Sequence, residues 1–367
     1  MTIEKLENWY QLNFENQLQG RRILFNDIEP ILLKLSNKFQ KEIIGYSESG
    51  TPIYMITLGT GPKKVLTWSQ MHGNESTGTK ALFDLFKLIE NPTEEFKPVV
   101  DAILTECTLK FIVLLNPDGS VKFTRENLND IDLNRDAVDR KAVESNLLRT
   151  HLDTFNPEFC FNLHDQRSIF NVEGTPNPAT ISFLAPSEDL ERTITKGRTE
   201  TMSVIVSMNE LLQKAIPNHI GRYTDEFYPT ATGDNFQKLG HNTILIEAGH
   251  YQNDYARDIV RKFNFFAILQ GLYFIATSKT YDNYQEYFKI PNNDKKFLDY
   301  VYKNITINEN NEIKVTDIGI QLKFKVIDGE LVSYKAIECT GNLSDFYTNN
   351  CINAEKMNIK DLKLSNS

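Results

Sequence analysis

The chain has 367 residues, of which 40% are hydrophobic and 11% aromatic, enough to bury a large core in one big domain beside a small one. Its 49 acidic side chains outnumber the 40 Lys and Arg residues, and the net charge of −9 argues against a broad nucleic-acid footprint. Residues 1–22 lack the apolar core of a signal peptide, and no apolar run has the length of a membrane span. We therefore expect a cytoplasmic globular protein that binds neither nucleic acid nor a membrane.

The cysteines give no sign of a disulfide framework or of a cysteine-rich metal site. They lie far apart and form no C-x-x-C pair, which is the spacing that either role commonly requires. The four are Cys107, Cys160, Cys339 and Cys351.

Along the first three quarters of the chain, apolar runs alternate with helical patterns. The runs that predict buried strands lie at residues 52–59, 63–69, 109–116, 158–164, 181–186 and 242–249. The patterns that predict helices lie at residues 78–90, 141–155, 202–214 and 255–278. Strands that are apolar along their length and separated by helices indicate an α/β sheet covered on both faces.

The character of the sequence changes after residue 285. From there, polar and apolar residues alternate, and the segments NENNE and DGE are turn signals, so we expect a small antiparallel appendage. The polar segment IPNNDKK marks the boundary. The prediction is a main domain over residues 1–285 and a small β-rich domain of unknown role over residues 286–367.

Three of the predicted strands end on side chains that bind metals or move protons. His72 and Glu75 follow one strand, His164 ends a second, and Glu247 lies near the end of a third. In open α/β sheets, ligands collect beyond the carboxyl ends of the strands. Two histidines and a carboxylate are the ligand set of many catalytic zinc sites, which leave a fourth position for water. Glu247 would then remain as a base.

Each of these residues also has an ordinary structural role open to it. His72 and Glu75 can form a loop hydrogen bond near a helix start, where a carboxylate is favoured. His164 alone is more often a histidine with satisfied hydrogen bonds, and Glu247 can be half of a buried ion pair. Their coincidence at strand ends favours the metal site. Structural roles are expected for the remaining histidines, which are His151, His219, His241 and His250.

Five motifs in order resemble those of the zinc carboxypeptidases, the M14 metallopeptidases of the funnelin type. They are HGNE at 72–75, NPDG at 116–119, RENLNDIDLNRD at 125–136, NLH at 162–164 and ILIEAG at 244–249. The resemblance covers roughly residues 40–280. It implies a mixed, mostly parallel, twisted eight-stranded sheet between helices, with the β-rich appendage added at the C-terminus.

The resemblance assigns a role to each residue of the site. It implies that His72, Glu75 and His164 bind one Zn²⁺ per chain. Glu247 matches the general base of the family, and Arg125 matches the arginine that polarises the scissile carbonyl.

The motif DIDLNRD carries the remaining roles. Asn134 and Arg135 match the pair that grips the terminal carboxylate of the substrate, a task that suits the two parallel donors of a guanidinium. Asp132 matches the carboxylate that holds the other N–H of the first histidine ligand. Standing alone, this motif would be a turn with an exposed arginine. We expect NPDG to be a type I turn that shapes a loop and takes no part in the reaction.

The segment before the base departs from the family in ways that leave two choices open. The tyrosine that closes over the substrate should lie here. Tyr228 is the first choice because TATGDNF after it resembles the run that follows this tyrosine in digestive members, and Tyr223 is the alternative. Asp234 would line the pocket for the last side chain and favour a basic group. Asn74 stands where digestive members carry an arginine, so substrate contacts should differ.

The implied activity is that of a zinc metallocarboxypeptidase, a hydrolase that releases the last residue of a peptide by Glu-assisted attack of a zinc-bound water. Its partner would be a peptide with a free C-terminal carboxylate. A zinc deacylase of N-acyl amino acids, similar to aspartoacylase and succinylglutamate desuccinylase, is the alternative, because that group shares HGNE and an NR pair. Arg125 and the candidate tyrosine favour the peptidase. A binding module that lost its chemistry is a third hypothesis, which the intact ligand set argues against.

Overall fold

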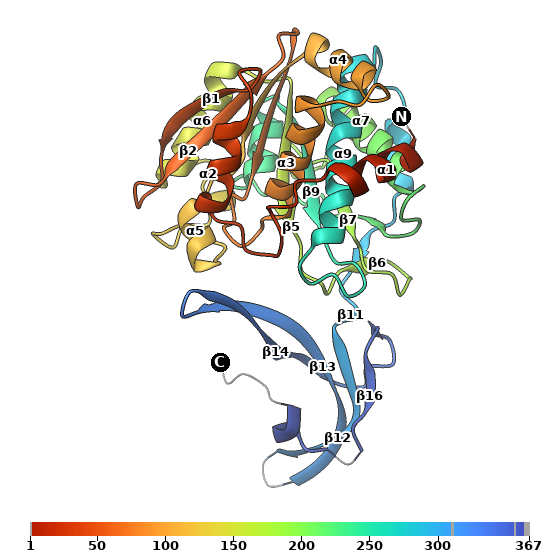
Figure 1. Cartoon of the computed structure of the whole chain (residues 1–367). Helices are drawn as coiled ribbons and strands as arrows, with labels where there is room; N and C mark the ends of the chain where they lie inside the picture. The colour runs from red at the N-terminus through yellow and green to blue at the C-terminus, as the bar shows by residue number, and fades with distance from the viewer. Residues whose placement is uncertain (1, 310–311, 356, 363–367) are drawn as a thin grey trace.

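The computed structural model describes residues 2–309, 312–355 and 357–362. Figure 1 shows a main body built on a sheet, with a smaller β-rich part below it that ends the chain. The sheet of the main body has eight strands in the spatial order β1, β2, β4, β3, β5, β9, β7, β8. These strands are β1 Gln40–Tyr46, β2 Pro52–Leu58, β3 Lys63–Ser69, β4 Cys107–Ile112, β5 Phe159–Asp165, β7 Ile181–Leu184, β8 Ile220–Arg222 and β9 Asn242–Ala248.

The centre of the sheet is parallel. Strands β4, β3, β5 and β9 run parallel to one another, and β8 is parallel to β7. Strand β2 is antiparallel to β1 and β4, and β7 is antiparallel to β9. The prediction of a mixed, mostly parallel eight-stranded sheet with a C-terminal β-rich part is therefore confirmed.

Helices cover both faces of the sheet because its strands bury side chains in both directions. On β3, Val65 packs into the core formed with α3, α7 and α9, whereas Leu66 and Trp68 pack into a second core with α6 and α8. The helices of the main body are α1 Ile3–Asn13, α2 Phe25–Lys34, α3 Thr77–Glu90, α4 Lys97–Glu106, α5 Pro117–Lys122, α6 Val143–Phe155, α7 Lys196–Leu212, α8 Thr232–Lys238 and α9 Asp258–Thr277, with the 3-10 turns η1 Leu133–Arg135 and η2 Tyr284–Lys289.

A buried ion pair joins α3, α9 and the segment after α1. Arg261 donates from Nε to Oδ2 of Asp84 at 2.7 Å and from Nη2 to Oδ1 at 2.6 Å. The same guanidinium donates to the backbone carbonyls of Glu15 and Leu18, and the N–H of Glu15 donates to Asp84. Both charged side chains are almost fully buried, and these hydrogen bonds offset the cost of removing them from water. The pair holds the N-terminal segment against the helices that support the sheet.

Helix α9 is long and apolar enough to cross a membrane by length and composition. However, 72% of its most apolar window is buried in the main body, where it packs against α3, α4 and α7. Its apolar composition is therefore explained by its place as the central core helix on this face of the sheet.

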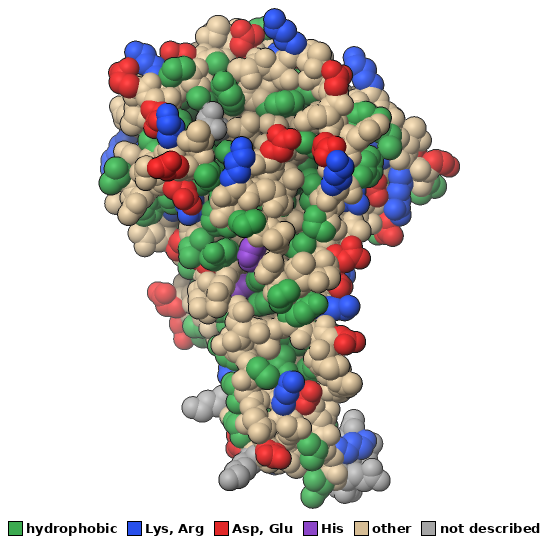
Figure 2. All heavy atoms as spheres, turned by 90° about the vertical axis from the view of Figure 1, so that its right-hand side faces the viewer, with side chains coloured by type: hydrophobic (Ala, Val, Ile, Leu, Met, Phe, Trp, Pro, Cys, Tyr) green, Lys and Arg blue, Asp and Glu red, His purple; other side chains and the backbone are tan. Residues whose placement is uncertain are grey.

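The C-terminal part has a sheet and a small core of its own. The strands in spatial order are β14 Glu330–Gly341, β13 Glu312–Ile327, β12 Tyr300–Glu309 and β16 Cys351–Asn353, and the remaining short elements are β6 Asn171–Val172, β10 Asn293–Asp294, β11 Phe297–Leu298, β15 Tyr347–Thr348 and η3 Ile359–Leu362. Figure 2 shows the molecule tapering toward this part, with acidic and basic side chains interspersed on the visible face. The boundary after residue 285 stays a prediction; Tyr287 and Ile290 pack in the main core.

Candidate metal centre

Two neighbouring parallel strands carry the candidate ligands to one edge of the sheet. His72 and Glu75 lie in the loop between β3 and α3, and His164 is the penultimate residue of β5. Strands β3 and β5 are in register, with Ser69 opposite Leu163, so their carboxyl ends meet at the same level.

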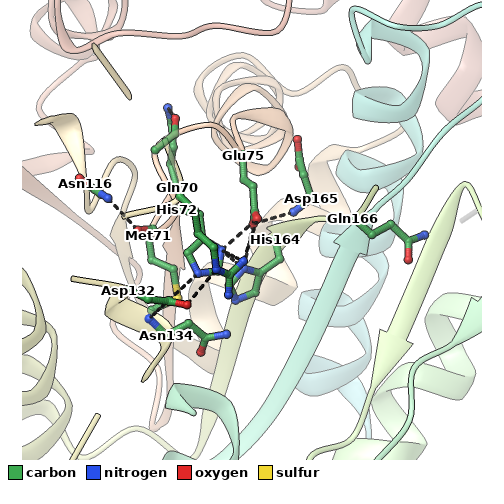
Figure 3. Close-up of polar contacts among 12 residues, drawn as sticks. Gln70, Met71, His72, Glu75, Asn116, Asp132, Asn134, His164, Asp165 and Gln166 are labelled. Atoms are coloured by element: carbon green, nitrogen blue, oxygen red, sulfur yellow. Dashed lines mark hydrogen bonds and ion pairs between the residues drawn. The ribbon is translucent and has the colours of Figure 1, made fainter. Parts of the chain in front are cut away.

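The three side chains converge on a common point, as Figure 3 shows. Nδ1 of His72 lies 2.9 Å from Oε1 of Glu75, and Nδ1 of His164 lies 2.9 Å from Oε2 of the same carboxylate. The two Nδ1 atoms are 3.1 Å apart. One candidate ligand atom from each residue lies within 4.8 Å of the others. Both imidazoles are at most 2% exposed, so the cluster is shielded from bulk water.

Asp132 orients the first histidine. Its Oδ1 lies 3.1 Å from Nε2 of His72, which places the imidazole N–H there and leaves the lone pair of Nδ1 for the cluster. Burial raises the pKa of Asp132, but hydrogen bonds and charge from His72 and Arg125 outweigh burial and hold this pKa well below its usual range. Burial lowers the pKa of His72, and Glu75 and Asp132 together raise it above its ordinary value.

The donor set fits a zinc ion. Two imidazole nitrogens and one carboxylate are the protein ligands of many catalytic zinc sites, and here the tautomer of His72 is set for metal binding by Asp132. His72, Glu75 and His164 are thus brought together as predicted and would hold the metal.

Arg125 lies directly beside the cluster. Its Nε donates to Oδ2 of Asp132 at 2.8 Å, and its Nη1 is 3.2 Å from Nδ1 of His72 and 3.6 Å from Oε1 of Glu75. The side chain is only 38% exposed, and the paired carboxylate fixes its direction. The predicted polarising cation is therefore placed at the ligand cluster.

Glu247 lies beside the second histidine on the adjacent strand. It is the register partner of His164 across β5 and β9, and partners of a parallel pair project to the same face of the sheet. Burial raises the pKa of the Glu247 carboxyl well above its ordinary value, and the charges of Glu75 and Asp165 add to this effect. A carboxyl with a raised pKa is suited to accepting a proton near neutral pH.

The other predicted substrate-binding residues form a second cluster at η1 and α8. Arg135 donates from Nη1 to the backbone carbonyl of Asn134 at 2.8 Å, and its guanidinium lies 5.8 Å from the centre of the Tyr228 ring. The N–H of Tyr228 donates to Oδ1 of Asp234 at 3.2 Å. Asp132 connects the two clusters, because its Oδ1 also accepts from the N–H of Asn134 at 2.9 Å.

The two candidate tyrosines differ in their freedom to move. Tyr223 is packed against Phe170, with ring centres 5.1 Å apart. Burial raises the pKa of its hydroxyl, as does the charge of Glu247. Tyr228 is 49% exposed and holds Glu226 through its hydroxyl. A side chain that closes over a substrate needs room to swing, so this difference favours Tyr228, and the assignment stays a prediction.

The NPDG segment shapes the ligand loop, although not as an isolated turn. It forms the first turn of α5, whose N-terminus is capped by the side chain of Asn116. The same side chain donates to the backbone carbonyl of Met71 at 3.1 Å. A side chain at Gly73 would collide with the backbone of Gly119, so glycine at position 73 permits the close approach of the two loops.

Sequence reasoning missed Asp165, whose backbone N–H binds the carboxylate of Glu75. The N–H of Asp165 donates to Oε2 of Glu75 at 3.0 Å, and Oδ2 of Asp165 accepts from the Thr77 hydroxyl at 2.7 Å. Arg257 lies 3.8 Å from the same carboxylate. Asp165 directly follows the NLH motif, so its place next to a ligand was a usable signal. Arg257 has no such signal, because it reaches the site from the loop before α9.

The remaining histidines have structural surroundings. Nδ1 of His241 lies 2.7 Å from the carbonyl of Pro157, and Nδ1 of His219 lies 3.0 Å from that of Pro178. His250 packs between aromatic rings, and burial lowers its pKa to about 3. His151 lies on α6, as expected.

Comparison with known proteins agrees with this geometry. Residues 29–188 match the profile of the family described as Zinc carboxypeptidase. Carboxypeptidase SOL1 of Arabidopsis thaliana is 31% identical over an alignment of 168 residues, which covers 41% of this chain and 34% of that protein. The match thus spans about a third of the length of this curated relative. The residues matched by the family profile include the three candidate ligands and end before Glu247.

Solved structures share the fold. A metallo-carboxypeptidase from Burkholderia cenocepacia aligns with a TM-score of 0.56 and 18% identity over 70% of this chain and 69% of that one. Carboxypeptidase A from Helicoverpa armigera aligns with a TM-score of 0.55 and 15% identity over 75% of this chain and 81% of that one. At these identities the likeness is one of fold. Together with the family profile, it confirms the resemblance that the motifs predicted.

Proposed function

Because residues 29–188 match the profile of the zinc carboxypeptidase family, we propose that this protein is a zinc-dependent metallocarboxypeptidase that releases the C-terminal residue of peptides. The observation that carries the proposal is the connection of two clusters through Asp132. One cluster is the ligand trio, and the other contains Asn134 and Arg135, the pair to which we assign the terminal carboxylate.

In the proposed reaction, some residues of the site bind the metal and the substrate, and others transfer protons or stabilise charge. Zinc held by the trio would supply a Lewis acid that makes water acidic enough to react near neutral pH. Glu247 would accept the proton of the attacking water and deliver it to the leaving amine. Arg125 would donate hydrogen bonds to the oxygen on which negative charge develops. Arg135 and Asn134 would hold the terminal carboxylate, so that the last amide lies over the metal.

The experiment that tests this function compares peptides with free and amidated C-termini. We expect amidation to slow hydrolysis severely, because Arg135 then loses its charged partner. Arg135→Lys keeps the charge and loses the two parallel donors, so kcat/KM on free peptides should fall roughly tenfold to a hundredfold while the zinc content is unchanged. Arg140→Lys, at an exposed position nearby, is the matched control and should behave as wild type.

Two outcomes would overturn the proposal. Equal rates on free and amidated peptides would remove the exopeptidase assignment. Turnover of acetylaspartate or succinylglutamate, with none of peptides, would assign the chain to the zinc deacylases instead. A liquid-chromatography screen of amino acids released from a mixed peptide library, with and without added zinc, reports the side-chain preference in the same experiment.

We also expect the preference for the released residue to depend on pH through Asp234. Burial raises the pKa of Asp234 to about 6, so the carboxyl is charged above this pH and neutral below it. The ratio of kcat/KM for peptides ending in Lys to those ending in Leu should therefore rise as pH increases through about 6. Asp234→Asn should flatten this rise. A ratio that is constant between pH 5 and 7.5 in wild type would exclude Asp234 from specificity.

A further inference from the structure

A pocket lies between the main body and the β13–β14 hairpin, beside the metal centre. Its volume is about 250 Å³. The residues that matter for its chemistry come from both parts of the chain: Arg21, Asn74 and Arg167 from the main body, and Lys323, Phe324 and Tyr334 from the hairpin. Figure 1 shows β13 and β14 below the main body.

The pocket adjoins the ligands through residues close to them in sequence. Asn74 lies between the ligands His72 and Glu75, and Arg167 follows His164 by three residues. In Figure 3, Asn134 lies on one side of the ligand cluster and Gln166 on the other. A peptide whose terminal carboxylate is held at Asn134, with its last amide at the metal, would direct its preceding residues toward this pocket.

Arg21 is a cation in the wall of this pocket that lacks a counter-ion. Its guanidinium lies 4.8 Å from the centre of the Phe324 ring. Among the described residues, no carboxylate lies within ion-pair distance of Arg21, and its buried Nε has no hydrogen-bond partner. Burial lowers the pKa of Arg21 to about 9, so it is still charged at neutral pH. A desolvated charge without a partner is costly, and a bound anion would remove that cost.

The carboxylates whose charges reach Arg21 are already engaged elsewhere. Asp165 accepts from Thr77, Glu75 contacts both histidine ligands, and Asp299 accepts from the Tyr255 hydroxyl at 3.0 Å. None of them supplies a direct partner for the guanidinium.

The other two basic residues of the pocket differ in their pairing. Arg167 at the rim is neutralised by Glu338 of the hairpin, 2.6 Å away. Lys323 is exposed and has no ion pair within the described part of the chain. Two positive charges, those of Arg21 and Lys323, therefore remain uncompensated around the pocket.

Contacts with the main body hold the β13–β14 hairpin in place as one wall of the pocket. Phe123 and Phe324 pack edge to face with ring centres 6.4 Å apart. Arg22 donates to the carbonyl of Gly329 at the hairpin turn at 2.6 Å and to that of Val121 in α5. A fixed wall limits what fits: a pocket of this volume is below the ~300 to 1,000 Å³ of sites for drug-sized ligands, so it suits one or two residues of a peptide.

We propose that this pocket binds a carboxylate on the acyl side of the scissile amide, so that the preferred substrates are short peptides with an acidic residue one or two positions before the released one. The inference rests on the proposed function and adds the class of substrate. It gives the C-terminal part a role in selecting substrates.

A binding measurement tests the proposal without requiring turnover. Zinc-loaded Glu247→Gln protein is titrated by calorimetry with the tripeptides Ala-Glu-Leu and Ala-Gln-Leu, which differ only in charge at the middle position. We expect the acidic peptide to bind about tenfold more tightly or better, since charge-assisted contacts with two cations are involved. Adding Lys323→Gln should remove most of the difference in affinity between the two peptides. The affinity for Ala-Gln-Leu should stay within about twofold of its value without this substitution.

Matched variants make the result specific to the pocket. Lys303→Gln, at an exposed position on β12 away from the pocket, should leave the preference intact. If the Arg21→Gln variant melts at the same temperature as the parent, it should lose the preference for the acidic peptide as Lys323→Gln does. If Arg21→Gln lowers the melting temperature, the result for Lys323→Gln alone tests the proposal, because Lys323 is exposed. Equal affinity for the two peptides, or a preference that survives Lys323→Gln, would overturn the inference. Absence of hydrolysis in wild type with the binding preference intact would instead count against the proposed function alone.

Discussion

Glu247→Gln is expected to retain a full complement of zinc and to lose turnover by about 10²- to 10⁴-fold. The amide keeps the shape of the side chain in its partly buried place beside His164, but it cannot accept the proton of the attacking water. The same residue would also protonate the leaving amine, so both halves of the reaction are affected. Metal analysis and kcat/KM on a peptide found by the library screen, measured on the same preparation, check this result.

The control for this substitution lies at the other end of the same sheet. Glu158 is exposed and directly precedes β5, far from the carboxyl ends of the strands, so Glu158→Gln should leave both zinc content and rate unchanged. If Glu247→Gln kept activity within a few-fold of wild type, Glu247 would be structural and the base would lie elsewhere.

His72→Ala and His164→Ala are each expected to abolish zinc binding, and activity with it. Among the residues that the structure describes, three ligands converge here, so losing one leaves two, which is fewer than catalytic zinc sites commonly retain. Asp132→Asn should have a graded effect, because it perturbs the orientation of His72 without removing a ligand; a loss of roughly 10- to 100-fold in metal affinity is typical of such partners.

The measurement is zinc content after dialysis against a weak chelator, with a melting curve for each variant. His151→Ala on α6, a histidine remote from the ligands, serves as the control and should bind zinc like the wild type. The same zinc content in wild type and both ligand variants would remove the metal centre from this location.

The strands that could be predicted from the sequence are those buried in the middle of the sheet. Six apolar runs correspond to β2, β3, β4, β5, β7 and β9; the run at 109–116 continues four residues past the end of β4, and the others overlap their strands closely. The two that could not be located are the edge strands. Strand β1 has mostly exposed and half-exposed side chains, and β8 has three residues, so neither leaves an apolar run in the sequence. Their presence was implied only through the family resemblance.

The site was predictable where chemistry and sequence position coincide. The ligands and Glu247 follow or end apolar runs, so their convergence follows from the parallel sheet. The pocket at Arg21 was not predictable, because it is assembled from several segments that lie far apart in the sequence. Nothing in the alternating pattern of β13 indicates that Phe324 stacks on an arginine from the N-terminal segment. Such contacts depend on how the hairpin packs against the main body.

The ion pair between Asp84 and Arg261 has a consequence for the order in which the chain folds during synthesis. Arg261 donates to the backbone carbonyls of Leu18 and Glu15, which precede it by 243 and 246 positions in the sequence. The core around α3 therefore cannot close until α9 has left the ribosome. Until then Asp84 lacks the guanidinium that donates to both of its carboxylate oxygens, and the nascent helices expose the faces that α9 later covers. A fragment cut at the limits of the family match, residues 29–188, would remain in that state permanently. We expect it to aggregate on expression, whereas a fragment that runs through α9 should be recovered folded.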